Sequence, residues 1–318
     1  MTYRHLRGAL SAWVVALSSL VGVAPAWAVA PKQPGAPLDD KAFFKPELYI
    51  STASVPLEDL KDQLPTRAAW EAFLGQRAGY VSEVKVFLDP RSGSAVNIMG
   101  AYPLLPGSGV GNEVTLESLG RSLGRKVARV DARVVGDAVL AFVRAHQPVL
   151  GIDVTQLGPP RVTQVDSDLW QVHIPQVVNG VPVRHGRLAA SISHGNLVVI
   201  GTETWGDARI DTSPRVSSSD AIDAGFAYVD GWQLGDVMVR DPALEVVPLA
   251  PPVYQDGETF SGPVGSGYEH RLVWTFEFQR PPELALWELM VDAHTAEVLA
   301  LRTRTSTSNG RSRVGCIP

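Results

Sequence analysis

The sequence predicts an α+β protein made of two successive modules, each a helix packed on an antiparallel sheet. Strand-like stretches with period-two alternation cluster in two regions, 169–200 and 272–301, and a stretch with helical periodicity precedes each region. Turn signals separate neighbouring strands, which therefore pair antiparallel. A helix followed by antiparallel strands gives a layer arrangement in which the sheet buries one face under the helix.

Composition limits the classes of partner. With 318 residues, 45% hydrophobic and 19% charged, the chain has a globular composition with room for two or three modules. Its formal net charge is -5, and it has no run rich in Lys and Arg. Nucleic acid and anionic membrane surfaces attract clustered basic residues, so we expect neither as a partner.

Residues 1–28 have the features of a secretory signal peptide. Two arginines precede an apolar stretch from Ala9 to Val23, and Ala26-Trp27-Ala28 forms a small-x-small cleavage site. The alternative, a membrane anchor, requires about 20 apolar residues, and Pro25 together with the small-x-small end argues against it. We therefore expect a mature chain that begins near Val29, is extracellular or periplasmic, and has no membrane span after signal cleavage.

Cys316 is the only cysteine, so no disulfide can form within the chain. Two interpretations remain open. The thiol is an incidental feature of the tail, or its partner lies on another chain or on sequence that follows Pro318.

The region before the first module reads as a linker and an entry segment. Residues 29–40 contain three prolines and a glycine, which is typical of an extended linker without a fold. In the entry segment 41–115, Thr66 is placed to cap a short helix. The stretch 80–88 is rich in strand formers, and the turn 89–93 follows it.

The first module centres on a hairpin. The helical pattern of Asp131 to His146 precedes three strands in meander order. Asn179-Gly180 between the first two strands predicts a type I′ turn, because both residues tolerate positive φ. Pro182 cannot donate to a ladder, so we expect an edge or a bulge there.

This hairpin carries a resemblance to a known family. Gln176 followed by Gly180, Val181, Pro182 and Val183 resembles the Q-x-x-x-G-V-P-V core of the fungalysin/thermolysin propeptide (FTP) module. Such modules are pro-regions of secreted zinc metallopeptidases, and in them a helix likewise precedes the strands.

The second module begins at Ser217, which with Asp220 forms a capping-box-like pattern before a helix that ends near Gly231. A short strand at 244–247 and a Pro/Gly-rich loop at 248–267 follow. Alternation from Leu272 to Phe278 then predicts a half-buried strand. Two further strands are predicted at 286–291 and 298–301.

The last hairpin resembles that of a PepSY module, which typically reads V-D-A-x-T-G-E-V. The matching residues are Asp292, Ala293, Thr295, Glu297 and Val298, and Ala296 replaces the usual glycine. If this position requires positive φ, the alanine strains the turn by about 1 kcal/mol.

No catalytic constellation is apparent in the sequence. None of the seven histidines begins an H-E-x-x-H motif, which a thermolysin-like zinc site requires. His173, His185 and His194 fall on the meander, but their spacing does not predict metal ligands. A G-x-S-x-G nucleophile elbow is also missing. We expect no enzyme activity and no cofactor in this chain.

Together the two resemblances imply a pro-region that inhibits a metallopeptidase, keeping it a latent zymogen, and assists its folding as an intramolecular chaperone. The partner would be the cognate metallopeptidase catalytic domain, which would hold the zinc. The alternative is a stand-alone secreted inhibitor or envelope-associated binding module. The expected parts are a signal peptide (1–28), linker (29–40), entry segment (41–115), FTP-like module (116–207), PepSY-like module (214–302) and tail or linker to a catalytic domain (303–318).

Overall fold

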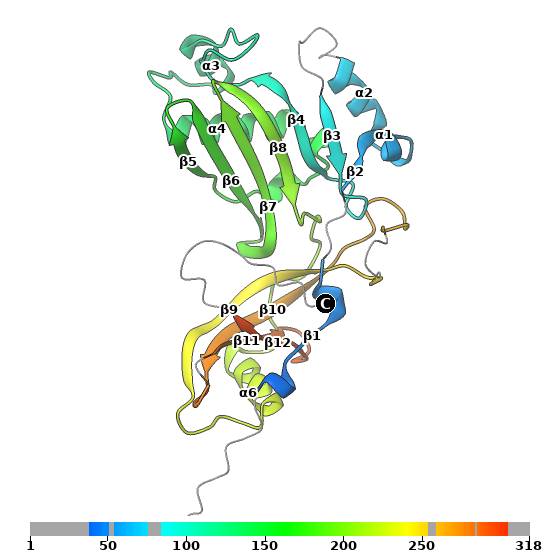
Figure 1. Cartoon of the computed structure of the whole chain (residues 1–318), viewed down its shortest axis with the longest axis vertical. Helices are drawn as coiled ribbons and strands as arrows, with labels where there is room; N and C mark the ends of the chain where they lie inside the picture. Colours follow the sequence, from blue (N-terminus) through cyan, green and yellow to red (C-terminus); the bar gives the residue numbers. More distant parts are fainter. Residues whose placement is uncertain (1–37, 51–53, 76–83, 254–258, 284, 305–318) are drawn as a thin grey trace, which may run out of the picture. The chain divides into compact units, whose positions relative to one another are not determined.

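Figure 1 shows the computed structural model, which describes residues 38–50, 54–75, 84–253, 259–283 and 285–304. Helices packed against antiparallel strands confirm the predicted α+β class. All described residues belong to one compact unit that begins at Pro37. Within them, no helix has the length and apolar character needed to cross a membrane.

Several predictions from the sequence fall outside these residues. They are the signal peptide, the linker up to residue 37 and Cys316 in the tail.

The described strands form one 12-stranded sheet, whose two parts are joined where β7 pairs with β9. The first part, which we call the first sheet, has seven strands in the order β5-β6-β7-β8-β4-β3-β2, and every neighbouring pair is antiparallel. The strands are β2 (Val55–Pro56), β3 (Lys85–Leu88), β4 (Ala95–Pro103), β5 (Arg161–Asp166), β6 (Leu169–Val178), β7 (Val181–Ser193) and β8 (Asn196–Glu203). The meander β6-β7-β8 is the one predicted from the turn signals.

Helices of this part are α1 (Leu57–Leu60), α2 (Arg67–Gly75), α3 (Leu116–Ser122), α4 (Ala132–Ala145) and α5 (Gln147–Leu150), with 3₁₀ turns at Lys61–Gln63 and Val154–Gln156. The Asp131 side chain caps α4 by accepting from Val134 N at 3.0 Å, as Asp commonly does at an N-cap. Helix α4 packs on β5 and β6 (Figure 1), and its buried stripe includes Val135 and Val139. The predicted helix on the hairpin sheet is therefore confirmed.

Both residues of the β6–β7 turn have positive φ, 50° at Asn179 and 87° at Gly180. These values fit the predicted type I′ turn. Pro182 pairs with Val177 on β6, whereas the pairing of β7 with β8 begins only at Arg187. Pro182 thus lies at an edge of the first sheet, where its missing N–H costs no ladder bond.

The second sheet has the order β9-β10-β11-β12-β1, again antiparallel. Its strands are β9 (Val237–Leu249), β10 (Glu269–Gln279), β11 (Leu286–Asp292), β12 (Val298–Arg304) and β1 (Phe43–Phe44). Helix α6 (Ser218–Tyr228) covers one face, and Ser217 caps it by accepting from Asp220 N at 3.1 Å. Phe226 of α6 packs on Phe276 and Phe278 of β10.

Three predictions about the second sheet need correction. β10 is not half-buried, because Val273, Thr275 and Glu277 on its other face are buried too. The predicted short strand at 244–247 is part of the longer β9, whose first half is exposed and has a register shift opposite Thr275–Glu277. β12 continues to Arg304, so the strand is longer than the predicted strand at 298–301.

The N-terminal segment also differs from the prediction. The linker was expected to carry no fold up to residue 40, but Leu38–Lys41 forms a 3₁₀ turn. Leu38 is buried in the core under α6. β1, from the predicted entry segment, pairs with β12, and a 3₁₀ turn at Pro46–Leu48 packs Leu48 on the same sheet. Apolar side chains thus attach this segment to the second sheet rather than to the first.

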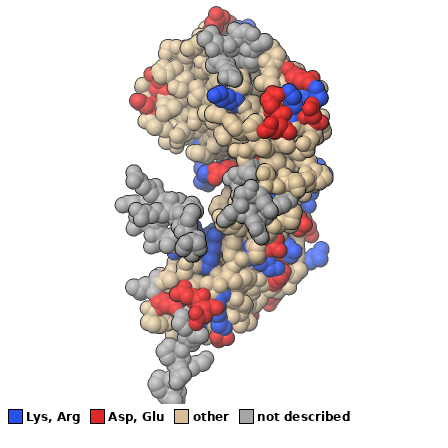
Figure 2. Space-filling model, turned by 45° about the vertical axis from the view of Figure 1, so that its right-hand side comes forward, with Lys and Arg blue, Asp and Glu red and all other residues tan. Residues whose placement is uncertain are grey.

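Several exposed charged side chains form ion pairs with neighbouring charges of opposite sign. Figure 2 shows basic and acidic groups interleaved on the face drawn. On α2, for example, Arg67 contacts Asp62 at 2.6 Å and Glu71 at 2.8 Å.

Candidate functional site where the two sheets meet

Gln176, the first residue of the FTP-like motif, is fully buried and fastens the segment that links the two sheets. Its Nε2 donates to Gln156 Oε1 at 2.8 Å and to Gly206 O at 2.7 Å. Gln156 in turn accepts from Ala208 N and donates to Ala208 O, both at 3.1 Å. Two glutamine side chains therefore hold residues 206–208 against the first sheet.

The rest of that motif forms the tip of the β6–β7 hairpin. Gly180 is in the turn, and Val181, Pro182 and Val183 begin β7. Val183 pairs in parallel with Val246 of β9, which is the backbone link between the two sheets. The hairpin tip is therefore one part of the first sheet that contacts the second.

The PepSY-like motif forms the turn between β11 and β12. Asp292 Oδ1 accepts from His294 N at 2.8 Å and Thr295 N at 2.9 Å, and its Oδ2 accepts from Arg271 Nη1 at 3.1 Å. Burial alone would raise the pKa of Asp292, but these hydrogen bonds hold it below its usual value. Glu297 forms an ion pair with Lys45. The geometry of the turn is thus set by one carboxylate that accepts hydrogen bonds from several donors.

Val298 begins β12 directly after this turn, and Ala293 is buried beneath it. The backbone of Ala293 is fully engaged: its N–H donates to Leu272 O at 2.8 Å, and its carbonyl accepts from Arg215 N and Val216 N at 2.9 Å. The turn therefore fixes the segment that leads into α6.

Residues from the two motifs meet in one buried apolar group, which we call the junction cluster. Val183 comes from the FTP-like motif and Ala293 from the PepSY-like motif. The full cluster consists of Val178, Val183, Ala208, Val246, Leu272 and Ala293. Motifs that are far apart in the sequence thus build a single contact between the sheets.

Next to the junction cluster, Arg184 adds ion pairs to the contact between the two sheets. Its guanidinium donates to Glu288 Oε1 at 2.9 Å and to Glu288 Oε2 at 3.2 Å, and it also binds Glu245. Arg302 Nε donates to Glu288 Oε2 at 2.6 Å. Phe276 of β10 faces α6, and successive side chains of a strand point to opposite faces of the sheet. Glu288 pairs with Glu277, the residue after Phe276, so the Arg184 network lies on the face of the second sheet that is turned away from α6.

Glu288 is 1% exposed. Burial raises the pKa of such a carboxyl, but hydrogen bonds and charge from Arg184, together with Arg302, bring the pKa of Glu288 below its ordinary value. The Glu288 carboxylate therefore stays ionised in its buried position. This charged form is stabilised by Arg184, which β7 supplies.

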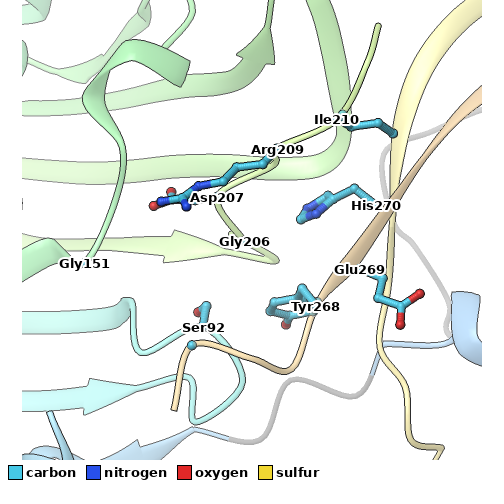
Figure 3. A pocket seen from close by; sticks show the side chains of 10 residues that line it. Ser92, Gly151, Gly206, Asp207, Arg209, Ile210, Tyr268, Glu269 and His270 are labelled. Carbon is cyan, nitrogen blue, oxygen red and sulfur yellow. The ribbon is translucent and has the colours of Figure 1, made fainter. Parts of the chain in front are cut away.

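A cleft of about 660 Å³ opens beside this junction. Figure 3 shows Tyr268 and His270 projecting into it from the start of β10, whereas Glu269 points the other way. The linking segment contributes further residues, and the remaining wall comes from the β3–β4 turn, from Gly151 directly after α5, and from the loop before β10. The lining residues are Ser92, Gly151, Gly206, Asp207, Arg209, Ile210, Gly265, Tyr268, Glu269 and His270.

His270 is a buried cleft residue whose pKa is strongly lowered. Its Nε2 is buried and has no hydrogen-bond partner among the described residues. Burial lowers the pKa of His270 to about 4, and the nearby Asp207 carboxylate offsets only part of that shift. The imidazole is therefore neutral at pH 7.

Polar contacts close the end of the cleft at the β3–β4 turn. Tyr268 donates its hydroxyl proton to Asp89 Oδ2 at 2.7 Å. Burial raises the pKa of both groups, and the Asp89 charge adds to the rise for Tyr268. Arg91 donates to the carbonyls of Gly267 at 3.1 Å and Pro251 at 3.2 Å. The turn 89–93, expected only as an entry hairpin, thus joins the first sheet to the loop before β10.

Several polar groups line the cleft and can form hydrogen bonds. The cleft offers one cation, the Asp207 carboxylate, the hydroxyls of Ser92 and Tyr268, and a neutral imidazole, a mixed set that can hydrogen-bond a polar chain. Across the described part of the chain, no group of three or more His, Cys, Asp and Glu side chains is placed to hold a metal ion.

Sequence reasoning found the two motifs but missed Arg184, His270, Asp89 and Tyr268. Arg184 follows Val183 directly, so a charge beside an apolar motif was a usable signal. The others converge only through the pairing of distant segments, which no local pattern shows.

Comparisons with known proteins add little to this geometry. No family model matches the chain, and no curated protein matches it significantly. Among solved structures, the C-terminal domain of Bacillus megaterium YpeB matches with 10% identity and a TM-score of 0.28. The alignment covers 78% of this chain and 98% of that domain.

Proposed function

We propose that this chain is a non-catalytic, secreted pro-region that binds the catalytic domain of a thermolysin- or fungalysin-like zinc metallopeptidase. It inhibits that domain and assists its folding. The observation that supports this most is the junction cluster, which contains both Val183 of the FTP-like motif and Ala293 of the PepSY-like motif. A chain that carried either motif by chance would have no reason to place both in one buried contact.

The burial of these motif residues also defines their role. Gln176, Val183 and Ala293 are covered within the chain, so they hold the two sheets together and leave other surfaces for the peptidase. In this proposal the chain supplies a rigid binding body, and the zinc belongs to the peptidase domain.

The test is a titration of residues 29–318 against each thermolysin-type catalytic domain encoded in the same genome. We expect slower peptide cleavage by one of these domains and a higher yield when that domain is refolded with the chain present. Association in trans loses the advantage of covalent linkage, so affinity in the micromolar range agrees with the proposal. No effect on cleavage or refolding at high micromolar concentration would reject it.

The chain alone should hydrolyse no peptide and retain no stoichiometric zinc. Casein cleavage and metal content after dialysis measure both properties. Zinc near one per chain, with activity abolished by a chelator, would instead identify an enzyme.

A further inference from the structure

Exposed apolar side chains gather at the corner between α6 and β9. Of the ten large hydrophobic side chains that are exposed in the described residues, five lie between residues 228 and 239. We call this set the corner surface, and its members are Tyr228, Trp232, Leu234, Val237 and Val239. Apolar residues concentrated in this way usually mark an interaction site, whereas single exposed ones do not.

The loop that presents the corner surface is held by a buried ion pair. Arg280 Nη2 and Asp236 Oδ2 are 2.7 Å apart, and both side chains are less than a tenth exposed. Arg280 also donates to the carbonyls of Val229 and Gly231 at 2.8 Å, and Asp236 accepts from Gln233 N at 2.8 Å. The fold thus fixes the backbone on both sides of Trp232.

Trp232 and Leu234 are displayed differently by this loop. The Trp232 ring packs on Phe226 with centroids 4.6 Å apart, yet 52% of the residue is exposed. Leu234 is fully exposed. A preorganised loop that holds an aromatic and an aliphatic side chain in solvent reduces the ordering cost of binding.

The neighbouring strand edge favours side-chain docking over strand addition. Arg240, Asp241 and Pro242 follow Val239 along β9, and the register with β10 shifts in the same stretch. Charged residues, proline and a bulge are the features that prevent a free edge from pairing with another strand. A partner therefore meets the corner surface through its own apolar side chains.

The position of the corner surface indicates which partner. Cross-strand pairs place Val237 beside Gln279, Gln279 beside Leu286, and Leu286 beside Arg304, all at one end of the second sheet. Three strand spacings, about 14 Å, separate β9 from β12. Residues 305–318 reach at most about 50 Å when extended, so a domain joined after them can contact the corner surface.

We propose that the corner surface docks the metallopeptidase catalytic domain, an inference that rests on the proposed function. The domain contributes an apolar patch that receives Trp232 and Leu234. Covalent linkage in the precursor raises the effective concentration of this patch, so a modest apolar contact suffices.

The test compares inhibition constants for the peptidase that the wild-type chain inhibits. The double variant Trp232→Ser/Leu234→Ser and the single variant Leu234→Ser are titrated beside the control Val110→Ser/Val165→Ser, which removes exposed apolar residues far away in the sequence. We expect the double variant to raise the inhibition constant at least tenfold, since central aromatic contacts commonly contribute that much or more. Leu234→Ser should raise it severalfold, and the control should leave it unchanged.

Thermal unfolding of each variant separates docking from folding. Leu234 makes no core contact, so its variant keeps the wild-type midpoint even if loss of Trp232 lowers it. Wild-type inhibition that both corner variants retain would overturn this inference and leave the proposed function standing. If the wild-type chain inhibits no peptidase, the proposed function fails, and this inference fails with it.

Discussion

Ala296 has a φ of 63° in the turn between β11 and β12. This left-handed conformation costs an L-residue about 1–2 kcal/mol, and glycine avoids that cost but loses more chain entropy on folding. We therefore expect Ala296→Gly to stabilise the protein by about 0.5–1 kcal/mol in urea unfolding. The matched control is Ala72→Gly, an exposed position within α2, which should destabilise by a similar amount. Equal destabilisation by both changes would show that Ala296 is not strained.

At Gly180 the positive φ is already occupied by a glycine, in contrast to Ala296. Its φ is 87°, and a Cβ added there would meet no atom within 4 Å. Backbone strain alone therefore determines the cost of a substitution, and it is largest for a β-branched side chain. Gly180→Val should destabilise by more than about 1 kcal/mol, and Gly180→Ala by less than the valine change. Thermal unfolding of both variants tests the turn, and a valine variant that unfolds like wild type would contradict it.

At the scale of elements, β7 belongs to the first sheet but supplies Arg184 to the second. Arg184→Met would leave Glu245 and the buried Glu288 without their main cation. Removing one partner of a buried ion pair typically costs about 3–5 kcal/mol, because the remaining charge is left uncompensated. We expect a loss of about 3 kcal/mol or more in chemical unfolding.

Arg187 provides the control on the same strand. Its ion pair with Glu203 is half exposed, with Nε and Oε2 2.6 Å apart. Exposed pairs contribute about 1 kcal/mol or less, so Arg187→Met should have little effect. Similar losses for the two variants would indicate that the Arg184 network does not hold the sheets together.

Local patterns were enough to predict the elements that close within a short stretch of chain. Asn179-Gly180 predicted the hairpin turn, and the apolar stripe of Asp131 to His146 predicted α4. The patterns did not show that Glu277 and Glu288 are buried, because a charged residue reads as a solvent-facing position when its partners lie elsewhere in the sequence. Leu38 was likewise assigned to a linker, since nothing next to it indicates that it packs under α6.

The residues of the candidate site also fall into two groups: those that local motifs identified, and those that only the pairing of distant segments brings together. Gln176, Val183 and Ala293 were identified through their motifs, although the motifs said nothing about their shared contact. His270 and Tyr268 lie at the start of one strand, and Asp89 lies in a distant turn. Only pairing between segments brings them to one cleft, so their environment could not be read from spacing.

For the molecule as a whole, the cleft should make stability depend on pH. The pKa of His270 falls from 6.5 to about 4 on folding. As pH falls below 6.5, the unfolded state binds a proton on His270 that the folded state does not bind. The contribution of His270 to the free energy of unfolding is therefore fully present above pH 6.5 and is lost as the pH falls toward 4. The loss is at most about 3 kcal/mol.

Urea unfolding of wild type and His270→Gln at pH 7.0 and pH 4.5 isolates this contribution. Glutamine keeps a polar side chain but does not titrate, so its variant should lose about 1–3 kcal/mol less between the two pH values. His185, whose pKa is also lowered by burial, is present in both proteins and cancels. Parallel pH profiles would mean that His270 is accessible to protons in the folded state.

The two ends of the described chain finish the same sheet. Leu38 N donates to Glu283 Oε1 across 245 residues, and β1 adds its two residues to the outer edge of β12. During synthesis, β1 is therefore made long before its partner strand β12. It stays unpaired while the strands of the first sheet, which are made earlier than β12, can already pair. Closing such a distant contact is slow compared with local pairing. We therefore expect the second sheet to be completed after the first, and a chain released before β12 is complete would leave Leu38 and Phe43 without the surface on which they pack.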